Sequence, residues 1–449
     1  AALLLFLLEA PSVPASLRSA GVLTAAFEPK PALLRTVTSD RRHFIDASTK
    51  DVLVMKGPNV VVKGPPWFPA VSGDSICNDT PFASCTTFNK HDAKHIKDMG
   101  WNTIRLGVTW AGAQPTSEQK LDEDWLAKLH AILDLCHSYG IHVLLDPHQD
   151  AVGSATCGFG VPQWFSKLAT PDEIGKPLQT SALWHLAGKN LKAFPNGTCG
   201  SEDTETWSLF AGADDYNLRN PCCLLNNADG WQQLEFTEQA QATWHYLFDE
   251  EGGRRHYVAF IRLLARAVRA RPAAFGIELY NEPFDINAEA MFKTWQECYQ
   301  AIQEEVPGML VGIVDVGEGA NSWWQTLITP WRAYWLRRQD YLFFAFHWYG
   351  MPSSPTDAIK HVGDYSWLWK MPALLTEFSD CGMQELTEKA GIGWLYWHYS
   401  QYCDTAPSPQ CGHGKSDCSF GACITGWGSG NSSRQCHPGL STSQSSLTI

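Results

Sequence analysis

The chain has 449 residues, of which 44% are hydrophobic and 18% are charged, a composition typical of a globular protein with a large buried core. Lys and Arg total 34 against 47 Asp and Glu, so the formal net charge is -13. An acidic chain of this kind is a poor partner for nucleic acid or for an anionic membrane surface. The length suits one large barrel or two ordinary domains.

The first segment, residues 1–32, contains a short Leu-rich run at 3–8. This run is far shorter than the ~20 apolar residues that a membrane span needs, so we interpret 1–32 as a clipped secretory signal or leader. Fourteen Cys, which we read as disulfides in loops, fit an exported protein, as do three glycosylation sequons, at Asn78, Asn196 and Asn431. We therefore expect a secreted protein, extracellular or in the lumen of the secretory pathway.

The next part of the chain alternates β-branched apolar runs with amphipathic stretches. Strands are predicted at 52–62, 102–108 and 141–150, and helices at 89–99 and 121–140. Strands that alternate with helices pair in parallel, because parallel strands need a crossover connection.

A much longer connection leads to the fourth strand, which is predicted at 276–283. Its first part, 151–250, carries several Cys and Trp and is predicted to be an elaborated loop with short helices, of the kind that usually serves function. Its last part, 257–272, has the pattern of an amphipathic helix. We interpret the basic residues of that helix as a solvated surface; they are Arg262, Arg266 and Arg269.

Four further apolar runs follow, at 309–316, 341–350, 372–378 and 391–399. Eight buried, parallel strands fit a (β/α)8 barrel better than a doubly wound sheet. We therefore predict an α/β fold, a (β/α)8 TIM barrel over 33–405 with a long loop insertion after strand 3 and a short Cys-rich C-terminal tail over 406–449.

Polar side chains gather at the predicted C-terminal ends of these strands, where a TIM barrel holds its active site. A single Glu at a strand end more often forms a cap or an ion pair, but polar residues at so many strand ends are hard to attribute to structure alone. The set is Lys63, Arg105, His148, Asp150, Asn281, Glu282, His347, Tyr349, Glu377 and Trp397.

Two of these residues, Glu282 and Glu377, are expected to face each other across the barrel mouth, with Pro283 ending the strand of Glu282. Carboxyls ~5 Å apart act as nucleophile and acid in a retaining glycosidase, whereas a wider gap predicts inversion. We expect mutual repulsion to keep Glu282 protonated and a cation such as Arg105 to keep Glu377 ionised.

The motifs IRLGVTW, DPHQD, LYNEP, HWYG, LLTEF and WLYW occur in this order and resemble glycoside hydrolase family 5, whose members are retaining β-glycosidases on a (β/α)8 barrel. The resemblance implies that Glu282 is the acid/base and Glu377 the nucleophile. It also implies that Arg105 and Tyr349 position or polarise the nucleophile. No metal or organic cofactor is expected, because two carboxylates suffice for this chemistry.

The same resemblance assigns the substrate contacts. It implies that Asn281 binds the sugar hydroxyl next to the reacting carbon, that His148 and His347 line the sugar subsite, and that Trp397 is its stacking floor. A narrower resemblance lies in GPNVVVKGPPWFP and HQD, which are similar to eukaryotic endoglycoceramidases. It implies that Lys63 and Asp150 bind the glucose next to ceramide, as a Lys donor and a carboxylate acceptor can do together.

We therefore expect a secreted retaining endo-β-glycosidase that cleaves glycosphingolipids between glycan and ceramide. The alternatives are another family 5 β-glucosidase or glucanase, including one that acts on a steryl glucoside, and a catalytically silent barrel that binds glycans. The expected partner is a glycolipid or β-glucoside substrate, which a monomeric enzyme would meet in transient contact with a membrane or micelle surface. The motifs leave the glycan head group open.

Overall fold

The computed structural model describes residues 35–62, 67–69, 71, 88–156, 158–171, 178–179, 181–182, 231–284, 287–314, 330–349, 354–378 and 381–397. The chain divides into two units, Ala1–Ala32 and Leu33–Ile449, and all the described residues belong to the second. The predictions for the leader, for Lys63, for the three sequons and for the Cys-rich tail concern positions outside the described residues.

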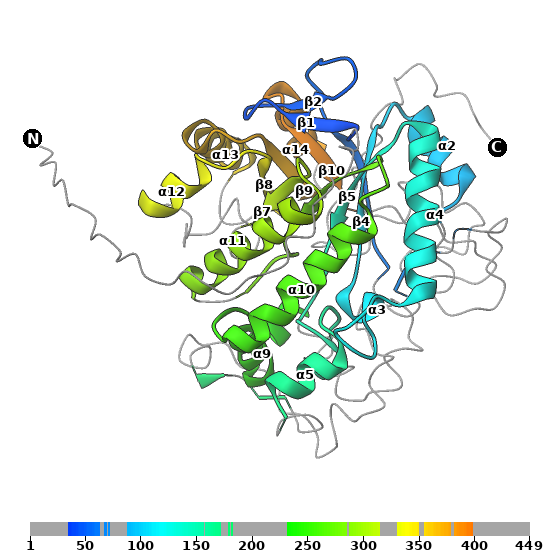
Figure 1. Cartoon of the computed structure of the whole chain (residues 1–449). Coiled ribbons are helices and arrows are strands. Elements are labelled where there is room, and N and C mark those ends of the chain that lie inside the picture. Colours follow the sequence, from blue (N-terminus) through cyan, green and yellow to red (C-terminus); the bar gives the residue numbers. More distant parts are fainter. Residues whose placement is uncertain are drawn as a thin grey trace, which may run out of the picture. The chain divides into compact units, whose positions relative to one another are not determined.

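Eight parallel strands close into a barrel (Figure 1). Their residues are buried at every position except the first of β3, because helices cover the outside and side chains fill the inside. The arrangement confirms the predicted (β/α)8 fold. In chain order the strands are β3 (Lys56–Val60), β4 (Thr103–Gly107), β5 (His142–Asp146), β6 (Ala274–Glu278), β7 (Leu310–Ile313), β8 (Leu342–Trp348), β9 (Ala373–Phe378) and β10 (Gly393–Tyr396).

Helices follow the strands in alternation, as the sequence predicts. Among the described residues, no helix is both long enough and apolar enough to cross a membrane. A short antiparallel pair, β1 (Val37–Ser39) and β2 (Phe44–Asp46), precedes the barrel. The helical elements are α2 (Lys90–Asp98), α3 (Trp110–Ala113), α4 (Glu123–Tyr139), η1 (Ser154–Thr156), α5 (Gln163–Ala169), η3 (Trp231–Phe236), α9 (Glu238–Phe248), α10 (Glu251–Ala267), α11 (Ala288–Glu305), α12 (Pro330–Leu336), α13 (Pro355–Trp369) and α14 (Cys381–Lys389).

Local sequence sets the ends of the predicted helices. At the start of α2, Asn89 and Asp92 form a reciprocal capping box. At the start of α4 the Asp122 side chain accepts the Trp125 N–H, and at its end Gly140 has φ 70°, a left-handed conformation that glycine adopts without steric cost. Both helices therefore lie where the sequence predicts them, within two residues at each end.

The strands are shorter than the apolar runs that predicted them. β6 ends at Glu278 instead of at residue 283; beyond this end Asn281 N–H donates to Pro147 O, directly after the neighbouring strand β5 (3.1 Å). Glu282 then takes a left-handed backbone conformation, with φ 39°. The prediction that Pro283 ends this strand is therefore wrong: Glu282 lies in the loop after β6.

The three arginines of the predicted helix 257–272 have partly exposed side chains, as the sequence predicts, and they also form ion pairs with α11. α10 packs along α11 (Figure 1), and the acidic end of α11 meets the basic face of α10. Arg262 pairs with Glu304 at 2.7 Å, Arg266 pairs with Glu305 at 2.7 Å, and Arg269 also pairs with Glu305. This packing could not be read from α10 alone, since its partner lies on another helix.

Two cysteines do not form the disulfides that the sequence leads us to expect. Cys136 in α4 and Cys298 in α11 are buried free thiols that pack in the hydrophobic core. Burial raises the pKa of both thiols, so they stay protonated and behave as small apolar side chains.

Two glycines offer a matched test of the packing. A Cβ at Gly57 in β3 would lie 1.7 Å from Thr103 O of the neighbouring strand, whereas a Cβ at Gly363, exposed within α13, would meet nothing within 4 Å. We expect Gly57→Ala to lower the free energy of unfolding by about 3 kcal/mol. Gly363→Ala should raise it by about 0.5–1 kcal/mol, because alanine favours a helix interior. Denaturant unfolding measures both; equal shifts would contradict this account of the barrel.

Candidate active site

Arg105 lies at the centre of the barrel with its side chain fully buried, and it binds three carboxylates. Its Nε and one terminal nitrogen donate to the two oxygens of Glu278, at 3.0 and 2.8 Å. Its other terminal nitrogen donates to Glu377 at 2.5 Å. Asp146 Oδ1 forms an ion pair at 2.9 Å with the terminal nitrogen that donates to Glu278. β4, β5, β6 and β9 each supply one of these four groups, so the cluster ties separate strands together.

The pKa values of the groups in this cluster shift in different directions. Burial opposes the charge on Arg105, but Asp146, Glu278 and Glu377 outweigh it and raise the pKa of the guanidinium. Burial, together with the negative charges of Glu278 and Glu377, raises the pKa of Asp146 well above its usual range. For Glu278 burial acts in the same direction, but Arg105 and His347 outweigh it, so its pKa is lowered. Of these two carboxyls, Asp146 therefore holds a proton more readily than Glu278.

Two amides complete the shell of Arg105. Asn59 accepts from one terminal nitrogen at 2.9 Å and Asn281 accepts from the other at 2.8 Å. Asn281 in turn donates to Gln149 O at 2.9 Å, and its side chain is almost fully buried. Much of the hydrogen-bonding capacity of Asn281 thus serves the protein itself, and its contact with a sugar hydroxyl stays a prediction.

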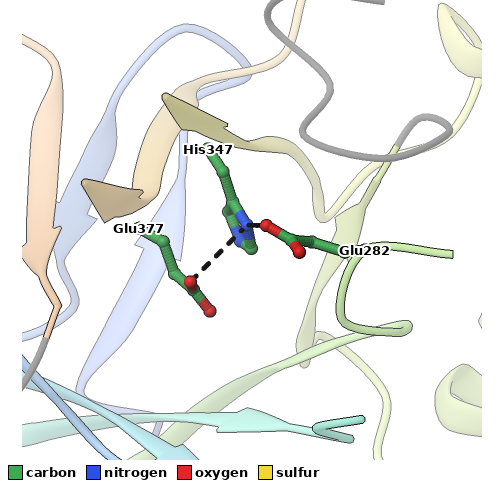
Figure 2. Close-up of side chains that lie close together, drawn as sticks. All are labelled: Glu282, His347 and Glu377. Atoms are coloured by element: carbon green, nitrogen blue, oxygen red, sulfur yellow. Dashed lines mark hydrogen bonds and ion pairs between the residues drawn. The ribbon is translucent and has the colours of Figure 1, made fainter. Parts of the chain in front are cut away.

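Glu282 and Glu377 face each other, with His347 between them (Figure 2). The side chains can present one carboxylate oxygen each within 4.8 Å of the other. His347 Nδ1 lies 2.7 Å from Glu282 Oε1 and 3.8 Å from Glu377 Oε2, and Tyr349 OH donates to Glu377 Oε2 at 2.8 Å. This separation matches the ~5 Å that retaining chemistry requires and is too short for a water between the two carboxyls.

His347 is a buried cation in this arrangement. Burial lowers the pKa of the imidazole, but the carboxylates of Glu377, Glu278 and Glu282 outweigh burial and raise the pKa to about 10. Its other nitrogen, Nε2, lies 3.8 Å from Glu278, an ion-pair distance that is too long for a hydrogen bond. His347 therefore presents a positive charge to both of the facing glutamates.

Glu282, His347 and Glu377 also have a spacing at which three side chains can hold a metal ion. A protonated imidazole has no lone pair to offer to a metal. Because His347 keeps its proton up to a pKa of about 10 and hydrogen-bonds Glu282, we interpret the three groups as a site for proton transfer.

Aromatic rings form a continuous stack beside these carboxylates. Trp397 lies parallel to His148, with ring centroids 5.3 Å apart, and His148 lies on Phe159 at 5.6 Å. Trp67 continues the stack beyond Phe159 at 6.2 Å. At this end a pocket opens, lined by Trp67, Ala111, Pro115, Phe159, Val161, Pro162 and Gln163. One face of Trp397 is covered by His148, so a sugar would stack on its other face.

The structure brings together nine of the ten predicted site residues; Lys63 lies outside the described residues. Asp150 is close to His148, with Oδ2 3.9 Å from Nε2, and His148 Nδ1 is 2.5 Å from Asp146. Their roles towards substrate remain predictions.

The sequence reasoning missed Asp146 and Glu278, although each is an acidic residue at the end of a buried strand. A buried charge requires a partner, and that signal was available in LLDPHQD and FGIELY. It also missed Gln149 and Glu235, which are both almost fully buried. The sequence around these two residues contains no comparable signal.

Known proteins resemble this chain in sequence and in fold. Residues 72–185 match the family model Cellulase (glycosyl hydrolase family 5). The chain is 25% identical over 411 residues to endoglycoceramidase I of Rhodococcus hoagii (strain 103S), across 83% of this chain and 70% of that protein. It is 28% identical over 254 residues to an endoglycoceramidase of Cyanea nozakii, across 56% of this chain and 42% of that protein. The chain thus spans less than half of the length of the second relative.

A solved structure of endo-glycoceramidase II from Rhodococcus sp., as its lactosyl-enzyme intermediate, matches the same fold. It covers 83% of this chain and 76% of its own, with a TM-score of 0.54 and 17% sequence identity. At this level of identity the likeness supports the barrel architecture.

Removal of the central cation tests the carboxylate cluster. Arg105→Met would leave three buried carboxyl groups around an apolar side chain, and we expect it to lower the free energy of unfolding by about 3–5 kcal/mol. Arg266→Met is the matched control, because its ion pair with Glu305 lies at the surface and half of the Arg266 side chain is exposed. The control should cost less than about 1 kcal/mol. Similar losses in the two variants, measured by denaturant unfolding, would contradict the central role of Arg105.

Glu235 gives a prediction about pH. Burial raises its pKa to about 8, although it accepts hydrogen bonds from Ala151 N–H and Trp244 Nε1. The unfolded-state pKa of a Glu is about 4.3, so at pH values between about 4.3 and about 8 unfolding releases a proton from Glu235. The stability that this group contributes is therefore complete below about pH 4.3 and is lost as the pH rises towards about 8. Glu235→Gln should remove this dependence of the free energy of unfolding on pH. If denaturant unfolding gives the same difference in free energy between variant and parent at pH 5 and at pH 8, the prediction is contradicted.

Proposed function

We propose that the chain, whose residues 72–185 match the glycosyl hydrolase family 5 model, is a retaining endo-β-glycosidase that hydrolyses the bond between oligosaccharide and ceramide in glycosphingolipids. The observation that carries the reaction type is the approach of the Glu282 and Glu377 carboxylates to within 4.8 Å. That distance favours a covalent glycosyl-enzyme route with retention over direct attack by water with inversion.

In the first step Glu377 attacks the anomeric carbon while Glu282 gives its proton to the glycosidic oxygen. The carbon–oxygen bond to the aglycone breaks, the aglycone leaves as an alcohol, and the glycan is bonded to Glu377. Arg105 and Tyr349 both hydrogen-bond Glu377, which supports its assignment as the nucleophile, since they fix its oxygens and favour the ionised form.

In the second step Glu282, now a carboxylate, takes a proton from water, and the water oxygen attacks the anomeric carbon. The bond to Glu377 breaks, the glycan is released with the original configuration, and Glu282 is protonated again. His347 Nδ1, 2.7 Å from Glu282 Oε1, is placed to donate a hydrogen bond to the carboxylate of Glu282 between the two steps. The two glutamates therefore have different neighbours suited to different roles.

The lipid part of the proposal rests on the relatives. Curated proteins that match this chain along much of its length, from Rhodococcus hoagii and Cyanea nozakii, are endoglycoceramidases. Asp150 lies within the aromatic and acidic site, and we propose that it and Lys63 bind the sugar next to ceramide. Asn281, His148, His347 and Trp397 would hold the same sugar above Glu377.

Product analysis tests the substrate. Incubation with lactosylceramide should release intact lactose and ceramide, because an endo-acting enzyme cleaves at the lipid and leaves the bond between the sugars. Mass spectrometry of both products identifies the cleaved bond. Release of glucose from a soluble glucan or from a steryl glucoside, with lactosylceramide left intact, would instead support one of the other family 5 activities.

A nucleophile variant separates the enzyme from a silent glycan-binding barrel. We expect Glu377→Gln to lower kcat by at least about 10³-fold, because no covalent intermediate can form, while the lipid substrate still binds. Gln339→Glu, a change of the same size at a partly buried position after α12, is the control and should keep full activity. A parent protein that binds lactosylceramide without turnover would contradict the proposal.

A further inference from the structure

Glu282 holds a backbone conformation that its own sequence does not favour. Its φ of 39° lies in the left-handed region, which residues other than glycine adopt only at a cost in free energy. Such a conformation persists where surrounding contacts determine it, and these positions cluster at functional sites. The contacts that fix the main chain at Glu282 also set the direction of its carboxyl group.

Gln149 makes those contacts. Its side-chain amide Nε2 donates to two successive carbonyls, Asn281 O at 2.9 Å and Glu282 O at 3.1 Å. In return, Asn281 donates through Nδ2 to Gln149 O at 2.9 Å and through its backbone N–H to Pro147 O at 3.1 Å. The loops after β5 and β6 are thus joined by hydrogen bonds in both directions, and Gln149 is 1% exposed.

The other end of the Gln149 side chain is fixed as well. Its Oε1 accepts the N–H of Val152 at 2.8 Å. Ala151 and Val152 have φ 53° and 68°, so the turn that follows Gln149 is left-handed at two residues that are not glycine. For the β-branched Val152 this conformation is a marked outlier. The Gln149 side chain, which binds the main chain of Glu282, is therefore itself held by a second strained turn.

Glu235 holds that second turn from the long connection before β6. One carboxyl oxygen of Glu235 accepts Ala151 N–H at 2.9 Å, and the other accepts Trp244 Nε1 at 2.8 Å. Glu235 lies in η3 and Trp244 lies in α9, both outside the eight barrel strands. A continuous set of hydrogen bonds therefore runs from Trp244 through Glu235, the turn and Gln149 to the main chain of Glu282.

We propose that Gln149 is a positioning residue for the general acid: its side-chain amide holds the strained main chain of Glu282 so that the carboxyl points at the leaving oxygen, and Glu235 anchors Gln149. This inference rests on the proposed glycosidase function and assigns a role to the insertion after the third barrel strand. Gln149 touches no reacting atom; it acts through Glu282.

A positioning role has a signature that a purely structural role lacks. Protonation of the leaving oxygen matters when the leaving group is a poor one, such as the alkoxide of ceramide, and matters little when it is a stable anion, such as dinitrophenolate. Because kcat/KM reports the first irreversible step, transfer of the glycan to Glu377, it isolates the acid role of Glu282 from its later base role. Misplaced Glu282 should therefore slow one substrate class selectively.

The experiment compares Gln149→Ala and the size-matched Gln149→Met with the parent protein on lactosylceramide and on dinitrophenyl β-lactoside. The control is Gln303→Ala, because Gln303 makes the same kind of clamp elsewhere: its Nε2 donates to Met309 O at 2.8 Å and its Oε1 accepts Gly308 N–H at 2.9 Å. Each variant is assayed on both substrates from one preparation, so the ratio of the two kcat/KM values is independent of the folded fraction.

We expect both Gln149 variants to lower kcat/KM for lactosylceramide by about a hundredfold and to leave the dinitrophenyl glycoside nearly unchanged. Gln303→Ala should leave the ratio at the parent value. An equal loss on both substrates, or a ratio that does not change, would overturn the role of Gln149 while leaving the glycosidase function in place. A parent protein that hydrolyses neither substrate would overturn the proposed function and, with it, this inference.

Discussion

One buried guanidinium is the constraint on which the rest of the site depends. Arg105 binds Asp146, Glu278 and Glu377 in the barrel interior, where an unpaired charge would be very costly. Each partner comes from a different strand, so the ion pairs fix strand register and carboxylate position together. Arg105 also donates hydrogen bonds to the side-chain amides of Asn59 and Asn281. The barrel is thereby built around the group that keeps the proposed nucleophile in place.

The two facing glutamates are supported in opposite ways. Glu377 is the fifth residue of the strand β9 and receives hydrogen bonds from Arg105 and Tyr349, so a rigid element positions it. Glu282 lies in a loop with a left-handed backbone, beside the His347 cation. A rigid, ionised carboxylate suits a nucleophile, whereas a carboxyl that gains and loses a proton needs a neighbour that tolerates both states. The two glutamates therefore differ in backbone, one in a strand and one in a loop, as well as in their charged neighbours.

The long connection between β5 and β6 contributes to this arrangement. Besides short helices and part of the pocket wall at the end of the aromatic stack, it supplies Glu235, whose buried carboxyl holds the turn after Gln149. Its elements lie far from Glu282 in sequence, yet hydrogen bonds connect them to the main chain of that residue. Ordered insertions into a barrel often serve function, and here the described part acts on the geometry of the proposed acid.

By itself the sequence determined the eight strands and the ends of α2 and α4, because periodic apolar runs and caps such as Asn89, Asp122 and Gly140 are local signals. The helix predicted at 257–272 runs from Glu251 to Ala267 instead. It also identified Glu282, Glu377 and Arg105, since polar residues at the ends of barrel strands converge. Only the tertiary structure decided where β6 ends, that α11 neutralises the α10 arginines, and that Gln149 and Glu235 act on Glu282. These features depend on contacts between segments distant in sequence, and no local pattern encodes which segments meet.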